Sequence, residues 1–169
     1  MKQLKTLLLA AILFVGATSL VEAQSKVAHI NTKELIEAMP EMKSARAEIE
    51  KLSKTYEADI QNSVTELQNK VKQYDAEAAA QTDEENNKRM QEVQEMEQSI
   101  RQFQATAQQD IQKKEFDLLK PITEKAKAAI LKVARAQGFE YVLDSTVGGG
   151  VLVSDGKDLM ADVKKELGF

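Results

Sequence analysis

Apolar residues recur every three or four positions along two long stretches of the chain, which is the spacing of amphipathic helices. The outgoing stripe comprises Met42, Ala45, Ile49, Leu52, Tyr56, Ile60, Val64, Leu67 and Val71, and the returning stripe comprises Val93, Met96, Ile100, Phe103, Ala107, Ile111, Leu118 and Ile122. The stripes are mirror images about residue 82, so that Val71 falls opposite Val93 and every later pair keeps nearly the same register. This symmetry predicts a long antiparallel coiled-coil hairpin over residues 40–137.

The turn of the hairpin is predicted near residues 81 and 82. Thr82 and Glu85 have the spacing of a capping box, in which each side chain accepts a hydrogen bond from the backbone amide of the other residue. The acidic residues 83–85 also suit the positive end of the helix dipole. Each arm is about 40 residues long, which corresponds to roughly 60 Å.

The two ends of the mature chain, residues 24–39 and 138–169, predict one small β-containing body. The predicted strands are residues 26–31, 140–146 and 151–154, the last two joined by a hairpin turn at the glycines 148–150. A short helix begins at a second capping box, Asn31 to Glu34, and stops before Pro40; a last helix is predicted over residues 158–167.

Three short strands leave two open sheet edges and bury little apolar surface. We therefore expect a symmetric oligomer in which strands from several subunits complete one sheet or barrel. The fold class is α+β, mainly α, with a helical hairpin projecting from a β-containing oligomerisation body. The predicted oligomerisation residues are Val27, Ile30, Tyr141, Val142, Leu143, Val151 and Val153.

Pro121 lies inside the returning helix, near its base. It removes one helical hydrogen bond, to the carbonyl of Asp117, and predicts a bend. The bend is either a hinge that lets the arm pivot or a static kink.

The N-terminus has the pattern of an export signal. Lys2 and Lys5 precede the apolar run of residues 7–15, and cleavage is predicted after Ala23. The run is about half the length that a membrane span needs. The chain has no cysteine, which excludes lipid attachment at a bacterial lipobox and any disulfide. We expect an exported protein.

The mature chain is acidic. Removing residues 1–23 takes away two lysines and one glutamate and leaves 21 basic and 26 acidic residues, a net charge of −5. Between residues 74 and 97 only Lys88 and Arg89 oppose eight acidic side chains: Asp75, Glu77, Asp83, Glu84, Glu85, Glu92, Glu95 and Glu97. An acidic hairpin tip argues against binding to nucleic acid or anionic lipid.

The sequence offers little for catalysis. His29 is the only histidine, and metalloprotease, hydrolase and phosphate-loop motifs are missing. We therefore predict neither an enzyme nor a cofactor or metal site, and turn to binding. Flexible methionines suit adaptable contacts. The candidate client-binding residues are Met42, Met90, Met96, Phe103 and Phe116, with packing in the hairpin seam as the alternative for each.

The features follow one another in a specific order: an export signal, a strand leading into KELIEAMPEM (residues 33–42), a long hairpin, the segment 108–146 with its LLKPI and GFEYVLD stretches, and a C-terminal strand and helix. In this order the chain resembles the Skp/OmpH family of periplasmic chaperones for outer-membrane proteins. The resemblance covers essentially the whole mature chain.

The resemblance implies a homotrimer whose strands form a shared β body and whose three hairpins enclose a cavity. Unfolded outer-membrane β-barrel proteins would be held there, without ATP, during transit through the periplasm. Better-known members of the family are basic and contact lipopolysaccharide, which the acidic tip of this chain disfavours. The alternative function is a structural coiled-coil scaffold or spacer of the cell envelope that binds no client.

Overall fold

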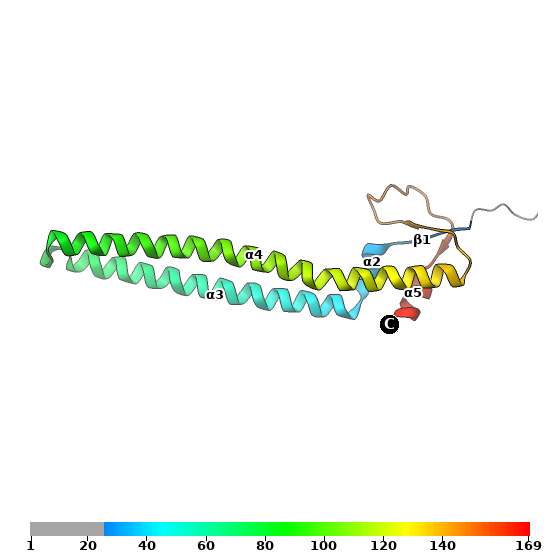
Figure 1. The fold of residues 1–169 in the computed structure, drawn as a ribbon, viewed down its shortest axis with the longest axis horizontal. Helices are drawn as coiled ribbons and strands as arrows, with labels where there is room; N and C mark the ends of the chain where they lie inside the picture. The colour runs from blue at the N-terminus through cyan, green and yellow to red at the C-terminus, as the bar shows by residue number, and fades with distance from the viewer. Residues whose placement is uncertain (1–25) are drawn as a thin grey trace, which may run out of the picture.

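The computed structural model describes residues 26–169, so the predicted signal peptide and its cleavage point after Ala23 lie outside the described residues. The elements in chain order are β1 (Val27–Ile30), α2 (Thr32–Ala38), α3 (Pro40–Glu77), the short 3-10 turn η2 (Ala78–Ala80), α4 (Asp83–Ala136), β2 (Tyr141–Asp144), β3 (Lys157–Asp158) and α5 (Met160–Leu167). Helices α3 and α4 form a long hairpin that extends away from a small body containing the other elements (Figure 1). The predicted mainly helical α+β fold is confirmed.

Local signals in the sequence begin and end the helices. The Asn31 side chain accepts a hydrogen bond from the amide of Glu34 at the start of α2 (3.0 Å), and Pro40 occupies the first position of α3. At the turn, the Thr82 hydroxyl accepts from the amide of Glu85 (3.2 Å). The reciprocal half of that capping box is not formed within residues 26–169, because the Glu85 carboxylate lies 3.7 Å from Nε of Arg89 instead.

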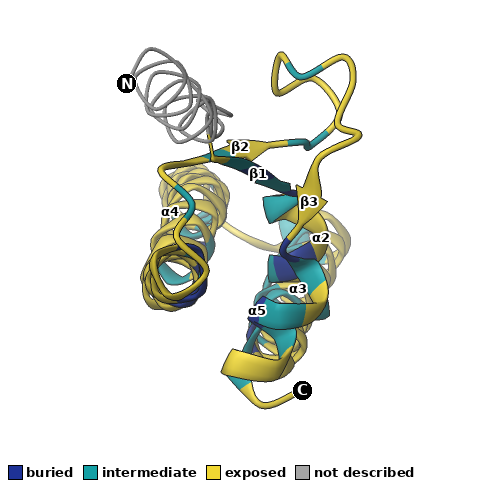
Figure 2. Ribbon diagram, turned by 90° about the vertical axis from the view of Figure 1, so that its right-hand side faces the viewer, coloured by how far each residue is buried: buried dark blue, intermediate teal, exposed yellow. Residues whose placement is uncertain are grey.

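The strands form one sheet in the order β2-β1-β3, with both neighbours parallel to β1. Val27 lies opposite Tyr141, and Ala28 lies opposite Lys157. The predicted strand at residues 151–154, with its antiparallel hairpin, is therefore wrong for the single chain. Since β2 and β3 run in the same direction, residues 145–156 must carry the chain back to the start of the sheet, and 151–154 belong to this return (Figure 2).

The hydrophobic core lies in the body, where β1, α2, α5 and the last third of α4 meet. Its largest fully buried side chains are Ile30, Leu35, Met39, Leu159 and Val163. Helix α4 contributes mainly small residues to this core, such as Ala126 and Ala129, which let the neighbouring elements approach closely. The arms beyond the body have almost no fully buried residues, because each helix of the hairpin has only one neighbour.

A polar cluster fastens β2 to the start of α2. The Asp144 carboxylate accepts hydrogen bonds from the hydroxyl of Thr32 (2.7 Å) and the hydroxyl of Thr146 (2.7 Å), and from both of their amides. Partial burial alone would raise the pKa of Asp144, but the bonds from Thr146 and Thr32 outweigh it and lower the pKa to about 2. The ionised carboxylate is thus part of the folded structure.

Pro121 lies within the continuous helix α4, where the arm joins the body. Figure 1 shows a shallow change of direction of α4 in this region. The hydroxyl of Thr123 donates to the carbonyls of Lys120 (2.8 Å) and Leu119 (3.1 Å), a bond back to the preceding turn that often accompanies a bent helix.

Candidate functional site: the two sides of the helical hairpin

The apolar stripes meet along one seam between α3 and α4. Every stripe residue is buried or half-buried, as the mirror-symmetric pattern predicted. Aromatic rings mark the middle of the seam, where Tyr56 and Phe103 pack edge to face with centroids 5.7 Å apart. Small residues, Ala45 and Ala107, are buried within it. The seam divides the surface of the hairpin into two sides.

Polar side-chain bridges between the arms lie on one side of the seam, which we call the bridged side. The bridging pairs are Glu41–Lys125, Glu48–Lys114, Tyr56–Asp110, Lys70–Glu92, Tyr74–Glu92 and Glu77–Arg89. On α3, Glu48 and Lys70 are 22 residues apart, about six helical turns. On α4, Glu92 and Asp110 are 18 residues apart, about five turns, so the pairs repeat on the same side of each helix.

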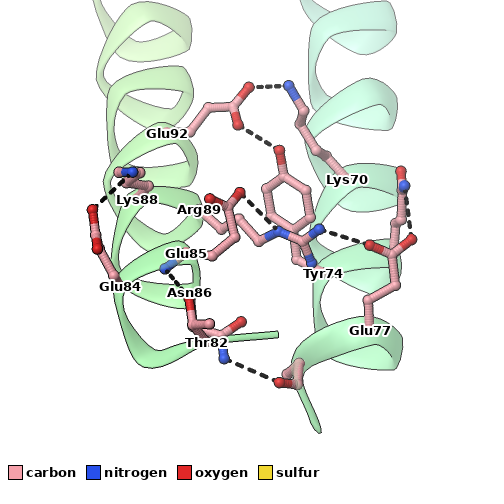
Figure 3. Close-up of polar contacts among 12 residues, drawn as sticks. Lys70, Tyr74, Glu77, Thr82, Glu84, Glu85, Asn86, Lys88, Arg89 and Glu92 are labelled. Carbon is pink, nitrogen blue, oxygen red and sulfur yellow. Dashed lines mark hydrogen bonds and ion pairs between the residues drawn. The ribbon is translucent and has the colours of Figure 1, made fainter. Parts of the chain in front are cut away.

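Three of the six bridging pairs lie near the tip, where Figure 3 shows them. The Tyr74 hydroxyl and the Lys70 ammonium both donate to the Glu92 carboxylate. The Arg89 guanidinium stacks over the Tyr74 ring and donates to Oε2 of Glu77 at 2.8 Å. The bond from Lys70, followed by that from Tyr74, lowers the pKa of Glu92, while the bond to Glu92 raises the pKa of Tyr74. This tip cluster joins the distal ends of the arms.

The acidic character of the tip is reduced by these pairs. Five of its eight carboxylates are within 4 Å of a basic side chain: Glu77, Glu84, Glu85, Glu92 and Glu97. Asp75, Asp83 and Glu95 form no ion pair within residues 26–169. Two of the basic partners, Lys70 and Arg101, lie outside residues 74–97, the segment over which the charges were counted from the sequence. Of these five carboxylates, Glu77 and Glu92 pair across the seam, and the other three pair within α4.

The other side of the seam, which we call the open side, is crossed within residues 26–169 only near the turn, where Nδ2 of Asn86 donates to the carbonyl of Ala78 (3.0 Å). It carries two grooves. The base groove, about 370 Å³, is lined by Met42, Ile49, Ser53, Glu115, Leu118 and Leu119 among others. The tip groove, about 390 Å³, is lined by residues that include Val71, Asp75, Ala78, Arg89, Met90 and Val93.

Helical spacing places both grooves on the same side. Ser53 and Val71 are 18 residues apart on α3, about five turns, and Met90 and Leu119 are 29 residues apart on α4, about eight turns. Leu119 is five residues from the bridging Lys114, which is about 140° around α4, with the seam between them. The open side is thus opposite the bridges.

The candidate client-binding residues separate into three groups. Met42 and Met90 line the open-side grooves, and Met90 is 54% exposed. Phe116 is 65% exposed on the outer surface of α4, one turn before Leu119. Met96 and Phe103 pack in the seam and line a third groove of about 380 Å³ on the bridged side, beside Glu66, Glu92 and Glu95.

The predicted oligomerisation residues also differ in position. Ile30 is buried in the core of its own chain, and Val27, Val142 and Val151 are half-buried. Tyr141, Leu143 and Val153 expose 62%, 45% and 73% of their surface. Beside them a groove of about 500 Å³ opens between the sheet and α4, with Ile36, Ile130, Leu131, Phe139 and Val142 in its lining. The body therefore carries an uncovered apolar surface.

Residues 26–169 contain no cluster of three histidine, aspartate or glutamate side chains that could hold a metal ion. None of the helices in this part of the chain is both long enough and apolar enough to cross a membrane. His29 lies in the middle strand of the sheet, and its Nε2–H donates to the carbonyl of Gly156 at 3.2 Å.

Comparison with known proteins covers nearly the whole chain. Residues 26–167 match the family of OmpH-like outer membrane proteins. The chain is 21% identical over 155 residues to the chaperone protein Skp of Pectobacterium atrosepticum, covering 92% of this chain and 93% of that protein. A crystal structure of an OmpH-like protein from Caulobacter crescentus has the same fold, with a TM-score of 0.76 at 16% identity over 86% of this chain and 85% of that one. The chain belongs to the OmpH-like family, whose members are chaperones and not enzymes.

Proposed function

We propose that this protein is a periplasmic holdase that binds unfolded outer-membrane β-barrel proteins without ATP and prevents their aggregation. The open side of the hairpin is the observation that carries this proposal. It offers apolar grooves and the exposed side chains of Met90 and Leu119 on a helix pair that is already held together from the other side. A holdase needs weak apolar contacts distributed over a long surface, since many of them together retain a client that each releases quickly.

We further propose that three copies assemble through their bodies, so that three hairpins surround a cavity. The apolar groove of the body and the exposed side chains of Tyr141 and Leu143 support this arrangement. Strand β2 is an edge strand, and its outer edge can accept another strand. The exposed Leu152 and Val153 of the 145–156 segment are candidates for that contact.

Native mass spectrometry of the mature chain, Gln24–Phe169, tests the assembly. We expect a trimer, and we expect Leu143→Arg in the body to reduce the trimer population strongly. Lys43→Glu on the arm also changes a charge but leaves the body intact, and it should remain trimeric. A wild-type monomer at micromolar concentration would contradict the shared body.

Dilution of a urea-unfolded outer-membrane β-barrel protein into the chaperone tests the holdase function. Light scattering should stay low, and mass spectrometry should find one client chain per trimer. The alternative function, a coiled-coil scaffold of the envelope, predicts a trimer that leaves the client to aggregate. Residues 1–23 should direct export, which N-terminal sequencing of the protein from a periplasmic extract would test by finding Gln24 first.

A further inference from the structure

The hairpin is chemically different on its two sides, and the difference runs along its whole length. The bridged side is covered by ion pairs and hydrogen bonds between the arms, from Glu41–Lys125 at the base to Glu77–Arg89 near the tip. The open side carries the base groove and the tip groove. We infer that the open side is the client-facing side of each arm, where the two grooves take apolar side chains of an unfolded polypeptide next to a lysine or arginine. This inference rests on the proposed holdase function.

Two of the three exposed large apolar side chains on the described arms line open-side grooves, and the third, Phe116, lies on the outer surface of α4. Met90 and Leu119 expose 54% and 37% of their surface, and each lines one of its grooves. Met42 lines the base groove and is half-buried. Methionine and leucine side chains adapt to different partners without a fixed geometry, which suits a client without a fixed fold. Each groove has room for one or two large side chains.

The charges lining the two grooves indicate which client residue should lie next to the bound apolar side chain. In the base groove, Arg46 is paired with Glu37 and Glu50 with Lys54, which leaves Glu115 without an ion pair in the described chain. In the tip groove, Arg89 is paired with Glu77 and Glu85. Asp75 is therefore also without an ion pair within residues 26–169.

Each groove thus combines an apolar floor with one uncompensated carboxylate at its edge. The complementary ligand is an extended peptide segment in which an apolar side chain is close to a positive one. A partner whose charges are mainly negative would be repelled from both grooves.

The bridged side is a poor alternative for the client. Its one groove has three glutamates, Glu66, Glu92 and Glu95, in the lining, and its apolar members, Met96 and Phe103, are needed in the seam. A client that inserted there would have to separate the bridges that hold the arms together. The lining of the base groove contains no member of a side-chain bridge between α3 and α4, and in the tip groove the bridging side chains Tyr74 and Arg89 form part of the wall.

Site-specific cross-linking of the full mature trimer tests the assignment. Because the chain has no cysteine, Met90→Cys and Leu119→Cys place a single thiol on the open side, and Ser99→Cys places one on the bridged side. Each variant carries a benzophenone maleimide and receives a urea-unfolded outer-membrane β-barrel protein before irradiation. We expect at least fivefold more client cross-linking from positions 90 and 119 than from position 99.

Equal or stronger cross-linking from position 99 would overturn the assignment. Light scattering on the same samples separates the two proposals. If the client stays soluble and cross-links mainly to position 99, the side is wrong and the holdase function stands. If the client aggregates in the presence of the wild-type chain, the holdase function itself fails, and the assignment fails with it.

Two further variants test the chemistry of the grooves. Met90→Gln with Leu119→Gln should weaken client binding about tenfold, since partial burial of two apolar side chains is lost. Ser99→Gln adds the same polar group to the bridged side and should leave the affinity unchanged. Asp75→Asn with Glu115→Gln should remove most of the salt dependence of binding. An unchanged affinity in the first variant, or an unchanged salt dependence in the second, would contradict the proposed groove chemistry.

Discussion

The guanidinium of Arg89 on α4 lies 4.6 Å from the centroid of the Tyr74 ring on α3. Arg89 also pairs with Glu77 on α3 and with Glu85 on its own helix, so one side chain joins the arms through both stacking and charge. It is the most buried of the ion-pairing cations, with only 15% of its side chain exposed. The last turns before the tip are therefore joined more firmly than a solvated helix end would be.

Replacing Arg89 with glutamine should loosen the tip. The stacking on Tyr74 is lost, and two carboxylates lose their cation, which we expect to cost about 1 kcal/mol of local stability. Hydrogen exchange of the amides around residues 70–95 should accelerate about fivefold, with little change in the body. Arg101→Gln removes a solvent-exposed pair with Glu97 and serves as the control, with exchange close to that of the wild type.

Phe103 and Phe116 should behave differently when replaced by alanine. Phe103 is half-buried against Tyr56 in the seam, and we expect Phe103→Ala to lower the free energy of unfolding by about 2 kcal/mol. Phe116 is 65% exposed, so Phe116→Ala should change the free energy of unfolding by less than about 0.5 kcal/mol. Urea denaturation followed by circular dichroism measures both. Equal losses would show that Phe103 does not hold the arms together.

Asp144 should make the stability of the body depend on pH. Its pKa is about 2 in the folded chain and ordinarily 3.8, so the ionised form is stabilised by folding. This contribution is fully present above about pH 4 and is lost as the pH falls towards 2. After allowance for the solvent exposure of Asp144, it amounts to about 1 kcal/mol.

The variant Asp144→Asn should therefore be less stable than the wild type at pH 7, and the difference should disappear near pH 2. Melting temperatures measured between pH 2 and pH 7 provide the test. Asp155→Asn, in the exposed connection before β3, is the matched control. A constant difference across this pH range would mean that the carboxylate charge contributes nothing.

Pro121→Ala distinguishes a hinge from a static kink. Alanine restores the amide that can bond to the carbonyl of Asp117 and removes the clash of the proline ring, so the helix should straighten and gain about 1 kcal/mol. Spin labels at Asp83→Cys and Ser145→Cys would report the distance between tip and body. A hinge predicts a broad distance distribution that narrows in the variant. A static kink predicts a narrow distribution that only shifts.

The hairpin could be predicted from the sequence because its two arms carry mirror-symmetric stripes and a cap between them. The sequence also predicts the strands that form β1 and β2, but it does not predict the third strand, β3. The run at Val151–Ser154 has the composition of a strand, but pairing in a sheet depends on where the chain returns, and Lys157–Asp158 takes the free edge of β1 instead. Composition alone does not distinguish a strand from an extended connection.

The two sides of the hairpin also became visible only in the structure. Asp75 and Glu115 are single carboxylates in a chain with many, and nothing in their local sequence distinguishes them from Glu92. Their roles depend on the rotation of each helix relative to the seam, which decides whether a side chain meets a partner across it. The stripe predicted the seam but not the sides.

The sheet pairs β1, near the start of the described chain, with β2, near its end, and this pairing determines the order in which the parts can fold. Contacts such as Lys70–Glu92 close a short loop, whereas β1 must wait for β2, which is more than 100 residues further along the chain. Helices α3 and α4 can thus pair progressively from the turn towards the body while β1 is still unpaired. During synthesis from the N-terminus, β1 stays unpaired until nearly the whole chain has been made. Completion of the body is then a late step, which can occur only once the entire polypeptide is present.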